Sequence, residues 1–178
     1  LKKRGARVWD YDPDLAISAN LTNPTVRALE DSLTIAERGE WTVAVQTGQA
    51  AITTAIMGTL QAGQQLLLPD NVYGPVKLLA ENQLKPLGIT TDYYDPQDIT
   101  ALEDKITPQT GLIYLESPAS LTFEVQDLAT IARTAKSKGV TTAIDNTYAT
   151  PPGWNPLEHG IDLVIHSLSK LVSGGSDV

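Results

Sequence analysis

Near the end of the sequence, a lysine follows two serines that close an apolar run. The segment "DLVIHSLSK" places Ser167 and Ser169 two residues apart, with Lys170 directly after them. Serine hydroxyls can donate hydrogen bonds to an anion such as phosphate, and a lysine amine can form a Schiff base with a carbonyl compound. Most lysines are only solvated surface charges, so Lys170 gains meaning from the residues that the fold brings near it.

Other residues with suitable chemistry follow the remaining apolar segments. Asp145 follows the uncharged run "TTAI", where an ionised carboxylate needs a partner. Gly48 begins a helix of small residues, whose backbone N–H groups and dipole could bind a phosphate. Tyr73 could stack on a pyridine ring. Together, a lysine, an acid on a buried strand, an aromatic ring, a glycine turn and two hydroxyls make a set that suits pyridoxal phosphate (PLP).

Each of these residues also has an ordinary structural explanation. Asp145 could cap the next turn, Gly48 could be a loop-to-helix glycine, and the serines could lie on the surface. The strand ends carry further polar residues whose roles the sequence leaves open: Thr47, Asn71, Glu116, Ser117 and Asn146. The PLP hypothesis therefore depends on the joint order of the residues rather than on any one of them.

Strands and helices alternate along the chain, which predicts an α/β fold with a mostly parallel sheet flanked by helices. The run "WTVAVQTG" predicts a strand and a turn. Apolar runs predict further strands at residues 64–70, 89–95, 110–117, 140–146 and 162–167, and helical spacing predicts helices at residues 23–39, 49–63, 73–88, 98–106 and 125–139. In such sheets, ligands bind at the carboxyl ends of the strands.

The composition narrows the class of protein. The net charge is -8, which argues against nucleic acid or an anionic membrane surface as a partner. There is no cysteine, so disulfides and thiolate metal sites are excluded, and only His159 and His166 could supply imidazole ligands. We expect no bound metal. No apolar stretch is long enough for a membrane span, and no signal peptide is recognisable, so we expect a cytoplasmic protein.

From Asn23 to Val178 the sequence resembles the PLP-dependent enzymes of cysteine and methionine metabolism, the trans-sulfuration family. The segments that carry the resemblance occur in the family's order: "NPTVRALED", "TGQAAI", "DNVYGPV", "YLESPASLTFEVQD", "AIDNTYATP" and "SLSKLVSGGSDV". The resemblance implies the large domain of the aspartate aminotransferase fold (fold type I). It also implies PLP as cofactor, amino-acid substrates and a homo-oligomer, a dimer-built tetramer.

The resemblance assigns a role to each candidate residue. Lys170 corresponds to the Schiff-base lysine, Asp145 to the partner of the pyridine nitrogen, and Tyr73 to the tyrosine that stacks on the ring. Gly48 and Gln49 match the phosphate-binding turn, although methionine or leucine is more common where Gln49 stands. Ser167 and Ser169 match the hydroxyl pair that binds phosphate, with Ser169 replacing a threonine. The predicted catalytic residues are Lys170 and Tyr73.

Some positions depart from the family's pattern. A tyrosine and an arginine that bind the phosphate of the neighbouring subunit are replaced by Ser18 and Asn20, which removes an aromatic group and a charge. Leu171 replaces a tyrosine and Gly175 a histidine. By this resemblance, residues 1–22 are part of an N-terminal arm and residues 23–178 a truncated PLP-binding domain. The family's C-terminal domain, which holds the substrate carboxylate, is then absent.

Within the family, "YLESPASLTFEVQD" is most similar to bacterial cystathionine β-lyases. Many γ-lyases and γ-synthases have an asparagine in a "TNP" segment where "ESP" stands here. We therefore expect a carbon–sulfur lyase that converts cystathionine to homocysteine, pyruvate and ammonia. The alternatives are a cystathionine γ-lyase, a γ-synthase or related sulfhydrylase, or a non-catalytic, degenerate member of the family.

Overall fold

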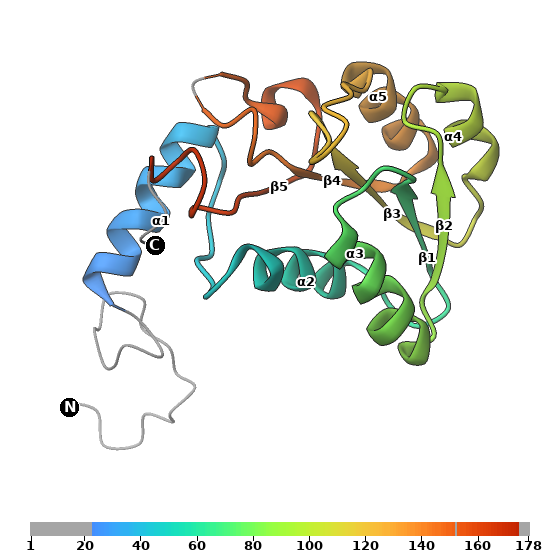
Figure 1. The fold of residues 1–178 in the computed structure, drawn as a ribbon, viewed down its shortest axis with the longest axis horizontal. Helices are drawn as coiled ribbons and strands as arrows, with labels where there is room; N and C mark the ends of the chain where they lie inside the picture. Colours follow the sequence, from blue (N-terminus) through green and yellow to red (C-terminus); the bar gives the residue numbers. More distant parts are fainter. Residues whose placement is uncertain (1–22, 152, 175–178) are drawn as a thin grey trace.

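A single parallel sheet organises the chain. The computed structural model describes residues 23–151 and 153–174, so Ser18, Asn20 and Gly175 lie outside the described residues. Five strands are hydrogen-bonded in the order β2-β1-β3-β4-β5, and every pairing is parallel (Figure 1). The strands are β1 (Gln65–Pro69), β2 (Thr90–Tyr94), β3 (Thr110–Glu116), β4 (Thr141–Asp145) and β5 (Leu163–Ile165). The predicted α/β architecture is confirmed.

Helices cover both faces of the sheet (Figure 1). One apolar cluster lies between the sheet and the helices α2 (Gly48–Thr59) and α3 (Gly74–Leu79). A second cluster lies between the sheet and the helices α4 (Ile99–Lys105) and α5 (Leu128–Lys138). Neighbouring residues of a strand point to opposite faces, so Tyr114 packs toward α2 while Leu115 packs toward α5.

Helix α1 (Pro24–Glu37) lies beside the β5 end of the sheet (Figure 1). Asn23 caps it by accepting a hydrogen bond from the Thr25 N–H at 2.8 Å, and Pro24 occupies the first turn, as predicted. The C-terminal end of α1 is anchored to the segment before β5. The Asn155 side chain donates to the carbonyl of Ala36 at 2.7 Å, and Arg38 forms an ion pair with Glu158.

Two predicted elements differ from the structure. The segment at residues 41–45 pairs with no strand among the described residues. It bonds to side chains of α1 instead: the Ala44 N–H donates to Oε1 of Glu30 at 2.9 Å, and the hydroxyls of Thr42 and Thr34 are 2.7 Å apart. The predicted helix at residues 73–88 is divided into α3, the π-helix η1 (Ala80–Leu84) and the 3-10 helix η2 (Lys85–Leu87). Pro86, which lacks an N–H group, lies in η2, where the α-helical pattern has ended.

Two kinds of feature, a membrane-spanning helix and a cluster of metal ligands, are not found in the described part of the chain. None of its helices has both the length and the apolar character needed to span a bilayer. No group of three or more histidine and acidic side chains gathers there in a way that could hold a metal ion. His159 lies in the 3-10 helix η3 (Pro156–His159), and its ring stacks on the ring of Trp154.

Candidate functional site

The carboxyl ends of β3, β4 and β5 meet at one edge of the sheet. The register pairs Glu116 with Asp145, and Asp145 with Ile165. Glu116 and Asp145 each follow, by two positions, a residue of the cluster under α2, so both side chains belong to the face that α2 covers. Of the residues that follow these three strands, Ser167 lies against the first turn of α2.

The first turn of α2 lies against Ser167. Thr47 caps the helix, because its hydroxyl accepts from the Ala50 N–H at 3.0 Å. The N–H groups of Gly48 and Gln49 precede the first intrahelical bonds, so they have no acceptor within the helix. A Cβ atom on Gly48 would lie 2.7 Å from Cβ and 2.8 Å from Oγ of Ser167. Only glycine permits this close approach of helix and hydroxyl.

Ser167, Ser169 and Lys170 form one polar cluster beyond β5. The hydroxyl oxygens of Ser167 and Ser169 are 3.1 Å apart, and the Lys170 amine donates to the hydroxyl of Ser169 at 3.2 Å. The strand ends earlier than predicted, at Ile165, so a turn rather than strand alternation brings the two hydroxyls together. Lys170 is exposed, and its amine is accessible to a small molecule.

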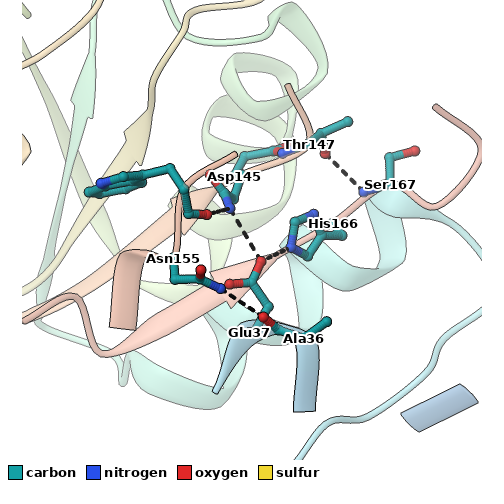
Figure 2. Close-up of polar contacts among 9 residues, drawn as sticks. Ala36, Glu37, Asp145, Thr147, Asn155, His166 and Ser167 are labelled. Atoms are coloured by element: carbon teal, nitrogen blue, oxygen red, sulfur yellow. Dashed lines mark hydrogen bonds and ion pairs between the residues drawn. The ribbon is translucent and has the colours of Figure 1, made fainter. Parts of the chain in front are cut away.

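Thr147 connects Asp145 to this cluster (Figure 2). The backbone N–H of Thr147 donates to Oδ1 of Asp145 at 3.0 Å, and its hydroxyl accepts from the backbone N–H of Ser167 at 2.9 Å. Thr147 is buried, which reduces the access of bulk water to both bonds. The acid that ends β4 and the serine after β5 are therefore connected through the side chain of Thr147, a role that the sequence did not indicate.

Tyr73 reaches the same edge through Glu116. The backbone N–H of Tyr73 donates to Oε2 of Glu116 at 2.8 Å, while Ser120 donates from both its N–H, at 2.6 Å, and its hydroxyl to Oε1. Tyr73 is 44% exposed, so a ligand could reach it. No direct hydrogen bond joins Tyr73 to the other predicted site residues within the described chain. Glu116 thus organises the Tyr73 loop, which the sequence did not predict.

Burial raises the pKa of two groups near this edge, the carboxyl of Glu116 and the hydroxyl of Tyr114. Burial raises the pKa of Glu116, and the hydrogen bonds from Ser120 and Tyr73 oppose that rise. Tyr114 lies fully buried on the same face. Burial, together with the nearby carboxylates of Asp145 and Glu116, raises the pKa of its hydroxyl well above the usual range. The Tyr114 hydroxyl therefore stays protonated beside the acids.

A second network lies behind the site (Figure 2). Glu37, the last residue of α1, accepts hydrogen bonds from His166 and from the side chain of Asn146. His166 was considered only as an imidazole ligand from the sequence, and Glu37 was not singled out. A signal did exist: an acid at the C-terminal end of a helix is disfavoured by the helix dipole unless another group compensates it.

Taken together, the arrangement can bind an anion beside an amine. The N-terminal end of α2 supplies two N–H groups and the positive end of the helix dipole, and Ser167 and Ser169 supply hydroxyl donors. Lys170 supplies an amine in contact with the Ser169 hydroxyl. Asp145 supplies a carboxylate for a cationic group on the same side of the sheet. These donors fit a phosphate ester that carries a carbonyl group and a basic ring nitrogen.

Comparisons with known proteins show which family the chain belongs to. The chain matches the Cys/Met metabolism PLP-dependent enzyme family over residues 17–178. It is 37% identical over 156 residues to the cystathionine β-lyase of Staphylococcus haemolyticus, an alignment that covers 88% of this chain and 40% of the relative. The chain therefore spans about two fifths of the length of the curated relatives that it matches.

Solved structures share the fold. The cystathionine γ-lyase of Lactobacillus plantarum, complexed with L-serine, matches with a TM-score of 0.90 and 35% identity, over 100% of this chain and 45% of that one. A Campylobacter jejuni structure that contains N′-pyridoxyl-lysine-5′-monophosphate matches with a TM-score of 0.84 and 33% identity, over 88% of this chain and 38% of that one. By the span of the family match and by its fold, the chain belongs to the Cys/Met metabolism PLP-dependent enzymes.

Proposed function

We propose that this chain supplies the PLP-binding part of a carbon–sulfur lyase that cleaves cystathionine by β-elimination to homocysteine, pyruvate and ammonia. The observation that carries the proposal is the convergence of Lys170, two serine hydroxyls and the first turn of α2 at one sheet edge. The family membership and its PLP dependence support the choice of cofactor.

In this proposal, the phosphate group is bound between α2 and the turn after β5. The N–H groups of Gly48 and Gln49 donate from the helix, and the hydroxyls of Ser167 and Ser169 donate from the other side. The absence of a side chain on Gly48 supports this, because a larger residue would fill the space between α2 and Ser167. The side-chain Oε1 of Gln49 is buried without a hydrogen-bond partner in the described chain.

The other predicted residues hold the ring and the reacting atoms. Asp145 keeps the ring nitrogen protonated, and Tyr73 stacks on the ring face. Lys170 holds the cofactor carbonyl between turnovers, and its freed amine takes the proton from Cα of the substrate. When bound, PLP supplies the electron-withdrawing ring that makes this proton removable. The electron pair left at Cα would form a double bond to Cβ while the bond from Cβ to sulfur breaks with its electron pair on sulfur. The sulfur would gain a proton as homocysteine leaves, and water would complete the release of pyruvate and ammonia.

The test uses the full-length natural protein and its Lys170→Ala variant, with visible absorption after addition of PLP and removal of the excess. We expect the parent to keep the band of lysine-bound cofactor and to release pyruvate from cystathionine, and the variant to do neither. A variant that releases pyruvate at the parent rate would refute the role of Lys170. A parent without the band would refute the cofactor site and favour a non-catalytic family member.

A γ-lyase or γ-synthase is the second candidate, because the cystathionine γ-lyase of Lactobacillus plantarum also matches this chain. The β- and γ-reactions begin alike and differ in the carbon that bears the leaving group. The same purified protein distinguishes them, since γ-elimination of cystathionine yields 2-oxobutyrate and β-elimination yields pyruvate. In the sequence, the "ESPASLT" segment supports the β-lyase, and in the structure its Ser120 binds Glu116.

A further inference from the structure

Glu37 is a buried acid in a helix whose other residues are exposed or half-buried. It is the only residue of α1 that is buried, and its side chain is 8% exposed. Its position in the last helical turn places a negative charge at the negative end of the helix dipole. An acid there is stable only if donors compensate both the dipole and the loss of water.

Two side chains supply those donors. His166 contacts Oε1 of Glu37 through Nε2, and the amide nitrogen of Asn146 donates to the same oxygen at 3.2 Å. Asn146 is fully buried, and its amide nitrogen also donates to the carbonyl of Trp154 at 3.2 Å. Because Glu37 accepts at Oε1 from both residues, it joins the segment after β4 to the segment after β5 (Figure 2).

The two partners of Glu37 are the immediate neighbours of two cofactor-site residues. Asn146 follows Asp145, and His166 precedes Ser167. Adjacent side chains in extended chain point to opposite sides, so Glu37 binds from behind while Asp145 and Ser167 face α2. The contact of Ser167 with Gly48 and the contact of His166 with Glu37 agree with this alternation.

We propose that Glu37 is a positioning residue for the cofactor site: its carboxylate, by binding both Asn146 and His166, fixes the separation between Asp145 and Ser167. The inference rests on the proposed function, since it concerns the same site. Thr147 links the two residues from the front, and Glu37 links their neighbours from the back. Without Glu37, the segments remain joined by Thr147 and by the backbone hydrogen bond from the Asn146 N–H to the Ile165 carbonyl at 2.9 Å. The Ser167 turn could then make only small shifts relative to Asp145, but a rigid cofactor that must contact both at once is sensitive to small shifts.

The test measures the PLP dissociation constant of the full-length protein by visible absorption and circular dichroism. We expect Glu37→Ala to raise the dissociation constant by about tenfold, as the loss of a charge-assisted hydrogen bond to the site would. We expect Glu37→Gln to stay within about threefold of the parent, because its side-chain oxygen can still accept from both partners. The visible circular dichroism should change in Glu37→Ala only.

Asp162→Ala is the matched control. Asp162 accepts from the N–H and the hydroxyl of Thr142, each at 2.8 Å, near the amino ends of β4 and β5. Its loss weakens the same two strands at the opposite end from the site. We expect the dissociation constant of Asp162→Ala to remain within about twofold of the parent, although its stability falls. A merely structural role of Glu37 predicts that both variants behave alike.

The proposal is overturned if Glu37→Ala binds PLP as tightly as the parent with unchanged circular dichroism, or if Asp162→Ala weakens binding equally. If Glu37→Ala does not fold, Glu37→Asp replaces it, because the shorter side chain withdraws the carboxylate from Asn146 and His166. Parent-like binding by Glu37→Asp then refutes the proposal. Failure of the proposed function would be recognised separately, because the parent itself would then show no lysine-bound cofactor.

Discussion

Replacing Gly48 by alanine should separate the first turn of α2 from Ser167. The added Cβ would lie 2.7 Å from Cβ and 3.2 Å from Cα of Ser167, whereas ordinary contact begins at 3.4 Å. Ser167 must therefore move by about 0.7 Å, the difference between 3.4 and 2.7 Å. Because Cα is also too close, the backbone of the turn has to shift, and rotation of the serine side chain alone cannot relieve the contact.

The size of the effect follows from two opposing contributions. Overpacking of this kind costs about 1–3 kcal/mol. The higher helix propensity of alanine returns at most about 1 kcal/mol. The free energy of unfolding should therefore fall by up to about 3 kcal/mol. If the shift removes one charge-assisted hydrogen bond to the phosphate, about 1.5–3 kcal/mol, the PLP dissociation constant rises by about tenfold to a hundredfold.

Gly58→Ala provides the control within the same helix. A Cβ on Gly58 would meet nothing within 4 Å, so this variant should gain up to about 1 kcal/mol of stability with PLP binding unchanged. Urea unfolding and equilibrium PLP binding, measured on the full-length protein, give both quantities. If Gly48→Ala binds PLP as tightly as the parent, the close contact with Ser167 does not shape the phosphate site, and the reasoning fails.

Two further predictions concern residues that support the sheet and its carboxyl edge. Asp162→Ala should lower the free energy of unfolding by about 1–3 kcal/mol in urea denaturation, because buried Thr142 loses its acceptor; an unchanged midpoint would contradict this. Burial raises the pKa of Glu116 above the unfolded value of about 4.3, so its contribution to stability is largest below that pH and declines as pH rises through the folded pKa. The difference in unfolding free energy between the parent and Glu116→Ala should therefore decrease as pH rises from about 4, and a difference that grows with pH would show that the hydrogen bonds from Ser120 and Tyr73 outweigh burial.

Much of the fold follows from local sequence. Asn23 with Pro24, and Thr47 with Gly48, mark the starts of α1 and α2, since caps act on the nearest backbone groups. Short apolar runs predict the five strands because both faces of a parallel sheet are buried. The segment at residues 41–45 was predicted wrongly because an apolar alternation does not reveal whether a neighbouring strand exists.

The candidate site was only partly accessible from sequence. Residues such as Lys170 and Asp145 carry distinctive chemistry at strand ends, so their type and place suggest a role. Contacts between residues far apart in the sequence are not indicated by the residues next to them. The link from Glu37 to His166 joins residues 129 positions apart, and the hydrogen bond from Tyr73 to Glu116 joins residues 43 positions apart. The fold brings these partners together, and neither partner's immediate neighbours in the sequence indicate the other.

The opposite orientations of His166 and Ser167 limit which changes of chain length this segment can accept. Deleting His166 would put Ser167 opposite Glu37 and turn Leu168 toward Gly48, where even a methyl group does not fit. Inserting one residue before His166 would turn the histidine ring toward Gly48 instead. A substitution in this segment can have a small or a large effect on the site, whereas a change of length reverses the orientation of every following side chain in the segment. We expect natural variation in loop length to avoid this short stretch and to accumulate in the exposed loop at residues 121–123, where the chain has room to bulge.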